Sequence, residues 1–548
     1  MIRKLDKKSA ALSKRTVPAE RDAARDPELA KPGTVMTFLV SICSGAATGV
    51  AWVDQSFGWL ALLGLAGFLT LHLTQRFRLR WHFLLAWLYG TACFTIATSW
   101  FPYSAGYLLG SETFSFAIGI AIWLYLGFQY ALIGVTLAAI RRRTSFAWLA
   151  VPTVWMGVLM MYPNMFPFMP ACLLTGHEPM LQLAEIGGVL LVSIYTIAIA
   201  GFIAWSFVGC ISFYRNGLMN NFMWRCLAGA VLLGIYFWGD ARTKTFDQQY
   251  QATNNRQLKV GLVQASTKYD VSHERMVSAA DSMASMVDLM IWPENSLGNY
   301  SAELTDFNDP NHVKAHSKGD HTGFQPWPNP GATLLAGADI WQPGEDGKAT
   351  RRFVGALVID EDQKLAGCRR KIKLMPFGEF IPGRTLIPKL HEWLGNGLPI
   401  SVGTDNTPLA EVKEVSIAAM LCCEDMFPAM AAGQIRDGGD LLVTIGNNIV
   451  FNSEVVGQQH FRIARFRAIE NRTPMLRCMT TGVSGLVSPS GRIISSLPEG
   501  EDAAGVLTVA IPEKKLTLFT RWGNSIPLTM MAIGLVTMVS LQRKKHHR

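Results

Sequence analysis

The sequence predicts a bundle of membrane-spanning helices joined to an α/β domain, with one more membrane helix at the carboxyl-terminal end. Hydrophobic residues make up 49% of the 548 residues, and the mean hydropathy of +0.21 is too high for a single soluble domain. The apolar residues form long runs over 35–240 and again over 524–541, which is typical of membrane spans. Residues 241–520 instead alternate short β-like runs with helical patterns, which is typical of an α/β fold.

These patterns divide the chain into four parts. Residues 1–34 are charged and lack apolar periodicity, which predicts a disordered cytoplasmic tail rather than a cleaved signal peptide. A seven-helix transmembrane bundle is expected over 35–240 and a soluble domain over 241–520. A closing transmembrane helix with a basic tail is expected over 521–548.

Arginines in alternate loops predict the orientation of the bundle. The expected spans lie at about 35–53, 57–74, 81–99, 114–139, 146–162, 180–208, 222–238 and 524–541. The second span is followed by Arg76, Arg78 and Arg80, the fourth by Arg141, Arg142 and Arg143, and the sixth by Arg215 and Arg225. The loops after the first, third and fifth spans contain no Lys or Arg. Because basic residues concentrate in cytoplasmic loops, both termini are expected in the cytoplasm and the soluble domain on the opposite side.

The net charge of +9 does not indicate a nucleic-acid-binding protein. The amino-terminal tail, the arginine-bearing segments and residues 543–548 hold 21 of the 50 Lys and Arg. The rest of the chain has 29 basic against 36 acidic residues. The soluble domain therefore lacks the basic excess that binds phosphate backbones.

No cofactor and no metal are expected. The nine cysteines have neither metal-ligand spacing nor the spacing of a disulfide framework. His312, His316 and His321 would form a metal-binding face only on a helix. The glycines and prolines around them disfavour a helix.

Within the soluble domain, strands are expected at 258–264, 289–292, 333–338, 353–359, 415–421, 441–445, 475–480 and 506–511. Helices are expected at about 272–285 and 454–471. Residues 488–491 are expected to form a hairpin turn, and the polar stretch 301–330 a long loop. The apolar stretch 374–400 fits either a core segment or a lid lying on the bilayer, and the sequence leaves both open.

Three residues with catalytic chemistry lie at or just beyond strand ends. They are Glu294 in IWPENS, Lys371 in KIKLMPFGEF and Cys422 in LCCEDMFP. Taken singly, each residue also fits a non-catalytic interpretation. Glu294 fits an acid in a turn, Lys371 a solvated lysine, and Cys422 a buried, unreactive thiol. Chemistry gathers at strand ends in open α/β sheets, so together they predict a Glu–Lys–Cys set. Glu294 would take the thiol proton, and Lys371 would stabilise the oxyanion formed when the thiolate attacks a carbonyl.

Cys423 directly follows the candidate nucleophile and offers a second thiol. Side chains alternate between the two faces of an extended strand. If Cys422 ends the strand, Cys423 is therefore expected to point to the opposite face. Only one of the two thiols would then face Glu294 and Lys371.

A family resemblance strengthens this interpretation. The segments VGLVQAS, IWPENS, KIKLMPFGEF, LCCEDMFP and QQHFRIARFRAIENRTPMLRCMTTGVSG occur in the order seen in the nitrilase (carbon–nitrogen hydrolase) superfamily. With its multi-span amino-terminal half, the chain resembles the apolipoprotein N-acyltransferase family over about 35–541. The resemblance implies an αββα nitrilase-like sandwich on the periplasmic side of a bacterial inner membrane, in a protein expected to be a monomer.

The resemblance also implies an activity and residue roles. A fatty acyl chain would move from a phospholipid, through a cysteine thioester, to the amino-terminal amine of a diacylglyceryl-modified apolipoprotein. Glu294 would be the base, Lys371 the oxyanion lysine, and Cys422, two residues before Glu424, the nucleophile. Glu379 and Glu424 would be supporting acids.

Some positions depart from the family pattern. Cys423 stands where the family often has an aromatic residue, and residues 354–355 and 447–451 also differ from it. Two other functions therefore also fit the sequence. One is a membrane-tethered amidase, for which water is the final acceptor. The other is a non-catalytic assembly protein related to conjugal-transfer proteins of this architecture, for which Cys422 is dispensable.

Overall fold

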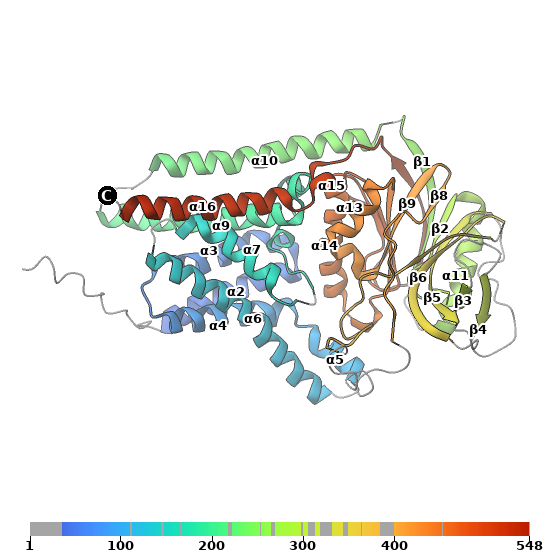
Figure 1. Ribbon diagram of the computed structural model, residues 1–548, viewed down its shortest axis with the longest axis horizontal. Helices are drawn as coiled ribbons and strands as arrows, with labels where there is room; N and C mark the ends of the chain where they lie inside the picture. Colours follow the sequence, from blue (N-terminus) through green and yellow to red (C-terminus); the bar gives the residue numbers. More distant parts are fainter. Residues whose placement is uncertain are drawn as a thin grey trace, which may run out of the picture.

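The structure is a computed structural model of the full-length chain. It describes residues 35–109, 112–143, 147–164, 166–216, 222–252, 254–264, 269–297, 300–304, 313–317, 331–343, 349–362, 364–383, 399–451 and 453–546. The tail expected over 1–34 lies outside these ranges. Figure 1 shows a helical bundle at one end of the molecule and a β sandwich at the other.

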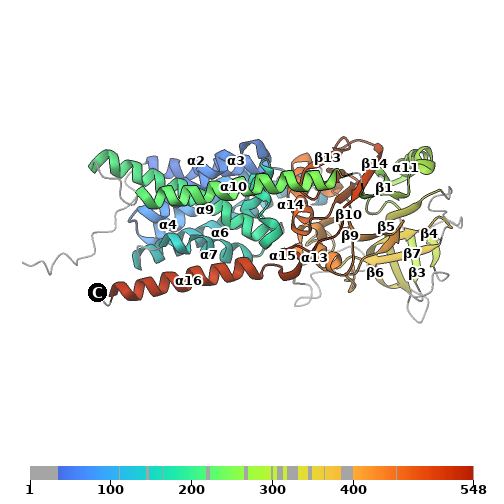
Figure 2. The ribbon, with the colours of Figure 1, turned by 90° about the horizontal axis from the view of Figure 1, so that it is seen from above.

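Each of the expected membrane spans falls on a helix. These helices are α2 (Val35–Val53), α3 (Gly58–Thr74), α4 (Leu79–Ala97), α6 (Glu112–Arg143), α7 (Ala147–Met161), α9 (Ala184–Asn216), α10 (Phe222–Tyr250) and α16 (Ser525–His546). Among the described residues, 6 helices are long and apolar enough to cross a membrane; α4 is not one of them, and α7 is apolar but has only 15 residues. Figure 2 shows α16 at the edge of the bundle, where it packs beside α7. The arrangement of seven spans before the soluble domain and one span after it remains a prediction.

Helix α9 is broken near its start. Gly187 and Gly188 have non-helical backbone angles, and Gly188 has a φ of +65°. A Cβ atom at Gly188 would lie 2.4 Å from the ring of Phe519 in α15 (Leu518–Trp522), so the break requires glycine. The break leaves Val189 at the start of the longer part of α9, with its N–H available to the sandwich.

The soluble domain contains two β sheets. The first has the order β14 (Ala503–Ile511), β1 (Arg256–Gln264), β2 (Leu289–Ile291), β5 (Thr333–Pro343), β3 (Tyr300–Leu304) and β4 (Val313–Ser317), with β6 (Ala349–Ile359) on β5 and β7 (Leu365–Arg370) on β6. The second has the order β13 (Ile493–Ser496), β12 (Gly485–Val487), β11 (Met475–Met479), β10 (Leu441–Gly446), β9 (Val415–Leu421) and β8 (Ala410–Val412). Strands β1, β2 and β5 run parallel, as do β9, β10 and β11. The carboxyl ends of each parallel set therefore meet at one edge of their sheet.

The two sheets pack face to face, with helices on both outer faces. Leu262 of β1 and Val443 of β10 belong to one buried cluster between the sheets. Helix α11 (Tyr269–Met283) covers the outer face of the first sheet. Helices α13 (Pro428–Arg436) and α14 (Glu454–Asn471) cover the outer face of the second. This αββα sandwich, inserted before α16, confirms the predicted fold class.

Helix α14 also fixes the sandwich against the bundle. Arg462 donates hydrogen bonds to the carbonyls of residues 51–53 in the last turn of α2. Gln459 donates to the carbonyl of Ala97 at the end of α4, at 2.7 Å. Carbonyls in the last turn of a helix have no partner within that helix. The two side chains therefore cap the ends of two bundle helices.

The eight strands predicted for the soluble domain are present as β1, β2, β5, β6, β9, β10, β11 and β14. The predicted hairpin turn at 488–491 is also confirmed. It joins the antiparallel strands β12 and β13, and the Gly491 N–H donates to the Ser488 carbonyl at 2.8 Å. Gly491 has a φ of +87°, which glycine adopts without strain.

The prediction of a long loop over 301–330 is wrong in the part of that stretch that the structure describes. Strands β3 and β4 pair antiparallel there, and β3 also pairs with β5. Strand β4 ends the order of its sheet. Edge strands tolerate polar residues, so β3 and β4 contain no apolar run by which they could be recognised as strands in the sequence. His316 lies on β4 opposite Ser301; His312 and His321 fall outside the described residues.

Candidate active site

Glu294 lies three residues beyond the end of β2. Trp292 and Pro293 lead the chain out of the sheet, and the Pro293 carbonyl accepts a hydrogen bond from the N–H of Gly337 in β5 at 3.2 Å. A Cβ atom at Gly337 would lie 2.5 Å from the Glu294 Cα, so the glycine lets the two segments touch. Only 4% of the Glu294 surface remains exposed. The carboxylate is therefore held in the interior at the strand ends.

Lys371 directly follows β7 and is bound to two carboxylates. Its Nζ lies 3.0 Å from the Glu294 Oε1 and 2.6 Å from the Glu379 Oε1. Glu379 is fixed in turn by the N–H of Met375, which donates to its Oε2 at 2.7 Å. Lys371 is 1% exposed, so the ammonium is held at one point by two acids.

Cys422 begins a short helical turn rather than ending a strand. Strand β9 stops at Leu421, and Cys422 starts the 3₁₀ turn Cys422–Met426 with a φ of +48°. This left-handed conformation is strained for a residue other than glycine, and such strain concentrates at functional sites. A Cβ atom at Gly446 of β10 would lie 3.1 Å from the Cys422 Cα, so the neighbouring strand end makes room for the turn. The thiol lies close enough to the Glu294 carboxylate for its negative charge to raise the thiol pKa, and the Cys422 Sγ lies 4.0 Å from the Asn447 carbonyl oxygen.

The expected alternation of Cys422 and Cys423 across a strand is wrong, because neither residue is in extended backbone. Cys423 is also buried, and its Sγ lies 3.2 Å from the Lys373 carbonyl, to which it donates. It packs in the apolar cluster that continues into the bundle, together with Met375. The turn therefore directs Cys422 to Glu294, and Cys423 to the backbone of the lysine segment.

Burial and charge set the protonation of the site. Burial raises the pKa of Glu294 above its ordinary value, although the Lys371 ammonium opposes this shift. Burial and the Glu294 charge raise the pKa of the Cys422 thiol well above its usual value. Burial alone would lower the pKa of Lys371, but Glu294, the two thiols and Glu379 raise it well above its usual value. The resting site therefore holds a neutral thiol, a charged lysine and a carboxyl group suited to proton transfer.

Glu424 lies behind the site and holds two of its segments together. One oxygen accepts the N–H groups of Ile372 and Lys373 at 2.6 and 3.2 Å. The other accepts the N–H of Leu421 at 3.0 Å and forms an ion pair with Arg369 at 3.2 Å. Glu424 is fully buried. Its role in the geometry is to fix the lysine segment against the cysteine turn.

Replacing Glu424 with glutamine is expected to destabilise the fold. The amide loses the charge that pairs with the 3% exposed Arg369 side chain. Leaving a buried charge without its partner typically costs about 3–5 kcal/mol. Thermal unfolding of the purified protein measures this loss. Asp405→Asn is the matched control, since Asp405 bonds locally to Thr407 at an exposed turn, and a loss as large in the control would contradict the assignment.

A second buried network links the cysteine turn to the bundle. Asp425 bonds to His460 at 2.6 Å and to Arg477 at 3.1 Å, and its carbonyl accepts from Arg467. Arg467 pairs with Glu470, which accepts the N–H of Val189 at the break in α9 at 2.9 Å. The Glu470 carboxylate thus lies at the amino terminus of the longer part of α9, where a negative charge is favourable. Two features of the sequence indicate this network. One is the pair Gly187 and Gly188 within an apolar run, and the other is the acids and arginines spaced along α14.

An apolar cavity of about 440 Å³ lies beside the lysine segment. Its walls come from the bundle and from the residues that flank Glu379, and they include Trp100, Ile122, Leu126, Phe166, Phe377 and Pro382. In the described part of the stretch 374–400, Phe377 is 65% exposed and Ile381 is buried. Residues 384–398 lie outside the described residues, so the choice between core and lid stays open for them. An apolar space therefore lies beside the lysine segment, on the side that faces the bundle.

The structure thus brings Glu294, Lys371, Glu379 and Cys422 together and places Glu424 behind them. Among the described residues, no group of three or more His, Cys, Asp or Glu side chains is arranged to hold a metal ion. The cluster can move a proton from a thiol to a carboxylate and can place a positive charge beside a developing oxyanion.

The chain is similar over most of its length to curated acyltransferases. The carbon–nitrogen hydrolase family matches residues 259–520, and the apolipoprotein N-acyltransferase N-terminal domain matches residues 44–202. The apolipoprotein N-acyltransferase of Azotobacter vinelandii is 27% identical, with 92% of this chain and 95% of the relative covered. That of Pseudomonas aeruginosa is 26% identical, with 92% and 96% covered.

Solved structures similar to this chain cover about half of its length. Nit3 of Saccharomyces cerevisiae, a nitrilase-superfamily member, has 19% identity and a TM-score of 0.33, covering 47% of this chain and 91% of that one. A carbon–nitrogen hydrolase of Helicobacter pylori has 14% identity and a TM-score of 0.33, covering 47% and 90%. Both domain families are matched in order, and relatives of one name extend over nearly the whole sequence. The chain therefore combines the two domains matched by these families and is similar to apolipoprotein N-acyltransferases over nearly its whole length.

Proposed function

We propose that this protein is a membrane N-acyltransferase. It moves a fatty acyl chain from a phospholipid, through a thioester on Cys422, to the amino-terminal amine of a diacylglyceryl-modified apolipoprotein. The observation that carries the proposal is the buried contact of Lys371 with Glu294 and Glu379 beside the Cys422 thiol. The similarity to apolipoprotein N-acyltransferases supports the class of donor and acceptor.

The first half-reaction forms the thioester. Glu294 takes the Cys422 proton, and the thiolate attacks the ester carbonyl carbon of the phospholipid. The carbonyl oxygen becomes an oxyanion, which the Lys371 ammonium and the Cys423 N–H stabilise. Collapse of this intermediate breaks the ester C–O bond. The proton on Glu294 passes to the departing oxygen, and a lysophospholipid leaves.

The second half-reaction releases the acyl chain to the acceptor. The amine of the apolipoprotein attacks the thioester carbonyl, and Glu294 accepts the proton that the amine loses. The C–S bond breaks, and the proton returns from Glu294 to the Cys422 sulfur. Lys371 stabilises the oxyanion again, so one set of groups serves both steps.

The apolar cavity supports a lipid as donor. Its walls combine bundle residues such as Ile122 and Leu126 with Phe377, which lies two residues from Glu379. An acyl chain gains free energy by leaving water for such a surface. The cavity thus places bundle residues and residues close in sequence to Glu379 around one apolar space, which an amidase acting on a soluble substrate does not need.

Thioester formation is expected to fall as the pH is lowered. Glu294 must be ionised to accept the thiol proton, and burial raises its pKa above the ordinary value. Protonation therefore removes the base at a higher pH than for an exposed carboxyl group. Single-turnover rates measured from about pH 4 to pH 8 should show this loss. A rate that stays flat down to the ordinary carboxyl pKa would contradict the role of Glu294.

We propose an inner-membrane orientation with both termini in the cytoplasm and the sandwich in the periplasm. The arginines at one end of the bundle support it. A reporter fused after Arg143 is expected to behave as cytoplasmic. A reporter fused within 301–330 is expected to behave as extracytoplasmic. Finding both reporters on one side would overturn the orientation.

The acceptor is tested by supplying the purified full-length protein with phospholipid and a diacylglyceryl-modified peptide. The expected product is the peptide carrying one amide-linked acyl chain. A matched peptide with an acetylated amino terminus should stay unmodified. Release of free fatty acid at the same rate with or without the amine would instead favour hydrolysis, and the amidase alternative.

A further inference from the structure

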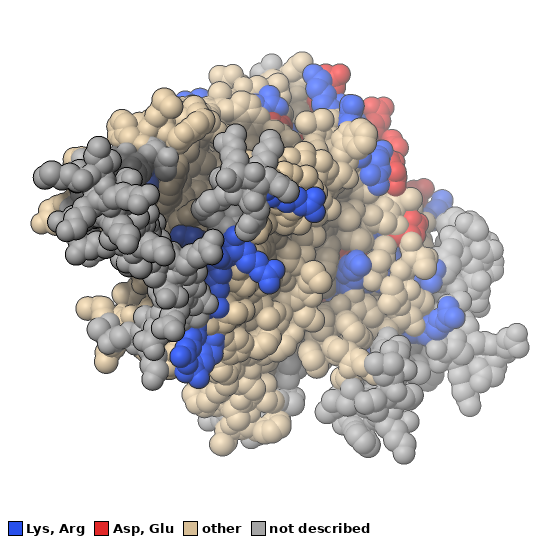
Figure 3. Space-filling view, turned by 60° about the vertical axis from the view of Figure 1, so that its left-hand side comes forward, with Lys and Arg blue, Asp and Glu red and all other residues tan. Residues whose placement is uncertain are grey.

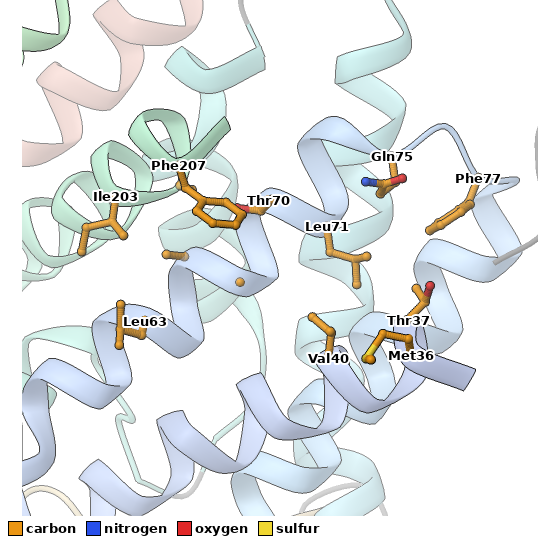
Figure 4. Close-up of a pocket in the computed structure, with 13 residues that line it drawn as sticks. Met36, Thr37, Val40, Leu63, Thr70, Leu71, Gln75, Phe77, Ile203 and Phe207 are labelled. Carbon is orange, nitrogen blue, oxygen red and sulfur yellow. The ribbon is translucent and has the colours of Figure 1, made fainter. Parts of the chain in front are cut away.

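A second apolar cavity lies at the end of the bundle away from the sandwich. It has a volume of about 430 Å³ and is formed by helices α2, α3 and α9. Its lining includes Met36, Val40, Leu63, Thr70, Ile203 and Phe207. Figure 4 shows these side chains around an open groove between the three helices. We call this cavity the basic-end groove.

The basic-end groove opens to the outside of the bundle. Met36 is 64% exposed, Leu63 is 50% exposed and Phe207 is 58% exposed. Below them, α2 and α3 are in close contact, since a Cβ atom at Gly67 would lie 2.4 Å from the Ser44 Oγ. Helices α2, α3 and α9 are all long and apolar enough to cross a membrane. The groove therefore faces the hydrocarbon of the bilayer rather than water.

One end of the groove is polar and basic. Gln75 and Phe77, in the connection from α3 to α4, line this end. Arg76 and Arg78 are exposed in the same short connection. Arg142 donates to the Phe77 carbonyl at 2.7 Å, which ties the connection to α6. The arginines are thus presented from a segment held at a fixed place.

Within the described residues, the charge at this end is of one sign. The described helices α3, α4 and α16 contain no Asp or Glu, nor do α9 and α10 over 189–238 where these are described. Figure 3, turned to bring this end forward, shows Lys and Arg side chains there and Asp and Glu toward the sandwich. Basic pockets between membrane helices bind the headgroups of anionic lipids.

We propose that the basic-end groove binds an anionic glycerophospholipid of the adjacent leaflet. One acyl chain lies along Val40, Leu63 and Phe207, and the phosphate is bound by Arg76 and Arg78. In the proposed orientation this is the cytoplasmic leaflet. The groove lies at the opposite end of the bundle from Cys422, so this lipid is a bound partner and not the acyl donor.

Native mass spectrometry of the full-length protein tests the proposal. The detergent-purified protein is titrated with phosphatidylglycerol and, separately, with phosphatidylethanolamine of the same chains. The wild type is expected to bind phosphatidylglycerol more tightly. Arg76→Gln and Arg78→Gln should each lower that affinity about fivefold, with a smaller effect on phosphatidylethanolamine. Thr70→Phe should lower the affinity for both lipids by filling the groove.

Arg143→Gln is the matched control, because it removes a charge at the same end from α6, a helix that does not line the groove, whereas Arg76 and Arg78 flank Phe77, which does. It should leave the affinity for phosphatidylglycerol unchanged. Equal affinity for the two lipids, or an equal loss in the control, would overturn the proposal. A dimer that Thr70→Phe dissociates would also overturn it, by assigning the groove to a second copy. Acyl transfer should continue in every variant, so the result is independent of the proposed catalytic function.

Discussion

Cys422→Ser is expected to abolish the acyl-enzyme, whereas Cys423→Ser is expected to retain it. A serine hydroxyl is far less ionised than a thiol beside the same base, so the variant lacks the nucleophile. Cys423 instead donates to the Lys373 carbonyl, and a serine hydroxyl can donate in its place. Intact-mass measurement of both variants after exposure to phospholipid compares the two directly.

The opposite pattern would overturn the assignment of the nucleophile. An adduct that survives Cys422→Ser and disappears in Cys423→Ser would mean that the turn directs the second thiol to the substrate. The two residues differ by one position and are both buried. Each variant is therefore the control for the other in folding and expression.

Lys371→Met is expected to slow thioester formation by about 10²–10³-fold, the usual effect of losing one oxyanion donor. It is also expected to lower the free energy of unfolding. The Lys371 Nζ contacts Glu294 and Glu379 in a buried position, and breaking a buried ion pair costs about 3–5 kcal/mol. Single-turnover kinetics and thermal unfolding measure the two effects separately.

The double variant Lys371→Met/Glu379→Gln separates catalysis from stability. Neutralising Glu379 removes one of the two carboxylates that Lys371→Met leaves without a cation, so part of the lost stability should return. The rate should stay low, because no positive charge faces the oxyanion. Recovery of the rate together with the stability would mean that Lys371 acts only through the fold.

The fold could be predicted where a segment is buried and regular. Continuous apolar runs predicted the strands around Leu262 and Val443 and the long helices of the bundle. Strands β3 and β4 were not predicted, because strands at the edge of a sheet can be polar and then lack the apolar pattern of a buried strand. The number of membrane crossings could not be decided, since α7 is short for a span.

The candidate site could be predicted in composition but not in backbone geometry. Motifs at strand ends identified Glu294, Lys371 and Cys422, and the structure brings them together. The alternation rule failed for Cys422 and Cys423, because the left-handed residue at Cys422 depends on the space left by Gly446. The contact of Glu470 with Val189 joins residues 281 positions apart, which local sequence patterns do not encode.

Cys422 is proposed to carry the acyl chain between donor and acceptor. Intact-mass analysis of the purified full-length protein, after incubation with phospholipid and without any amine, tests it most directly. We expect a mass increase of one acyl chain that maps to Cys422 and disappears when a diacylglyceryl-modified peptide is added. An unchanged mass in protein that still transfers acyl chains, or no transfer at all in the folded wild type, would contradict it.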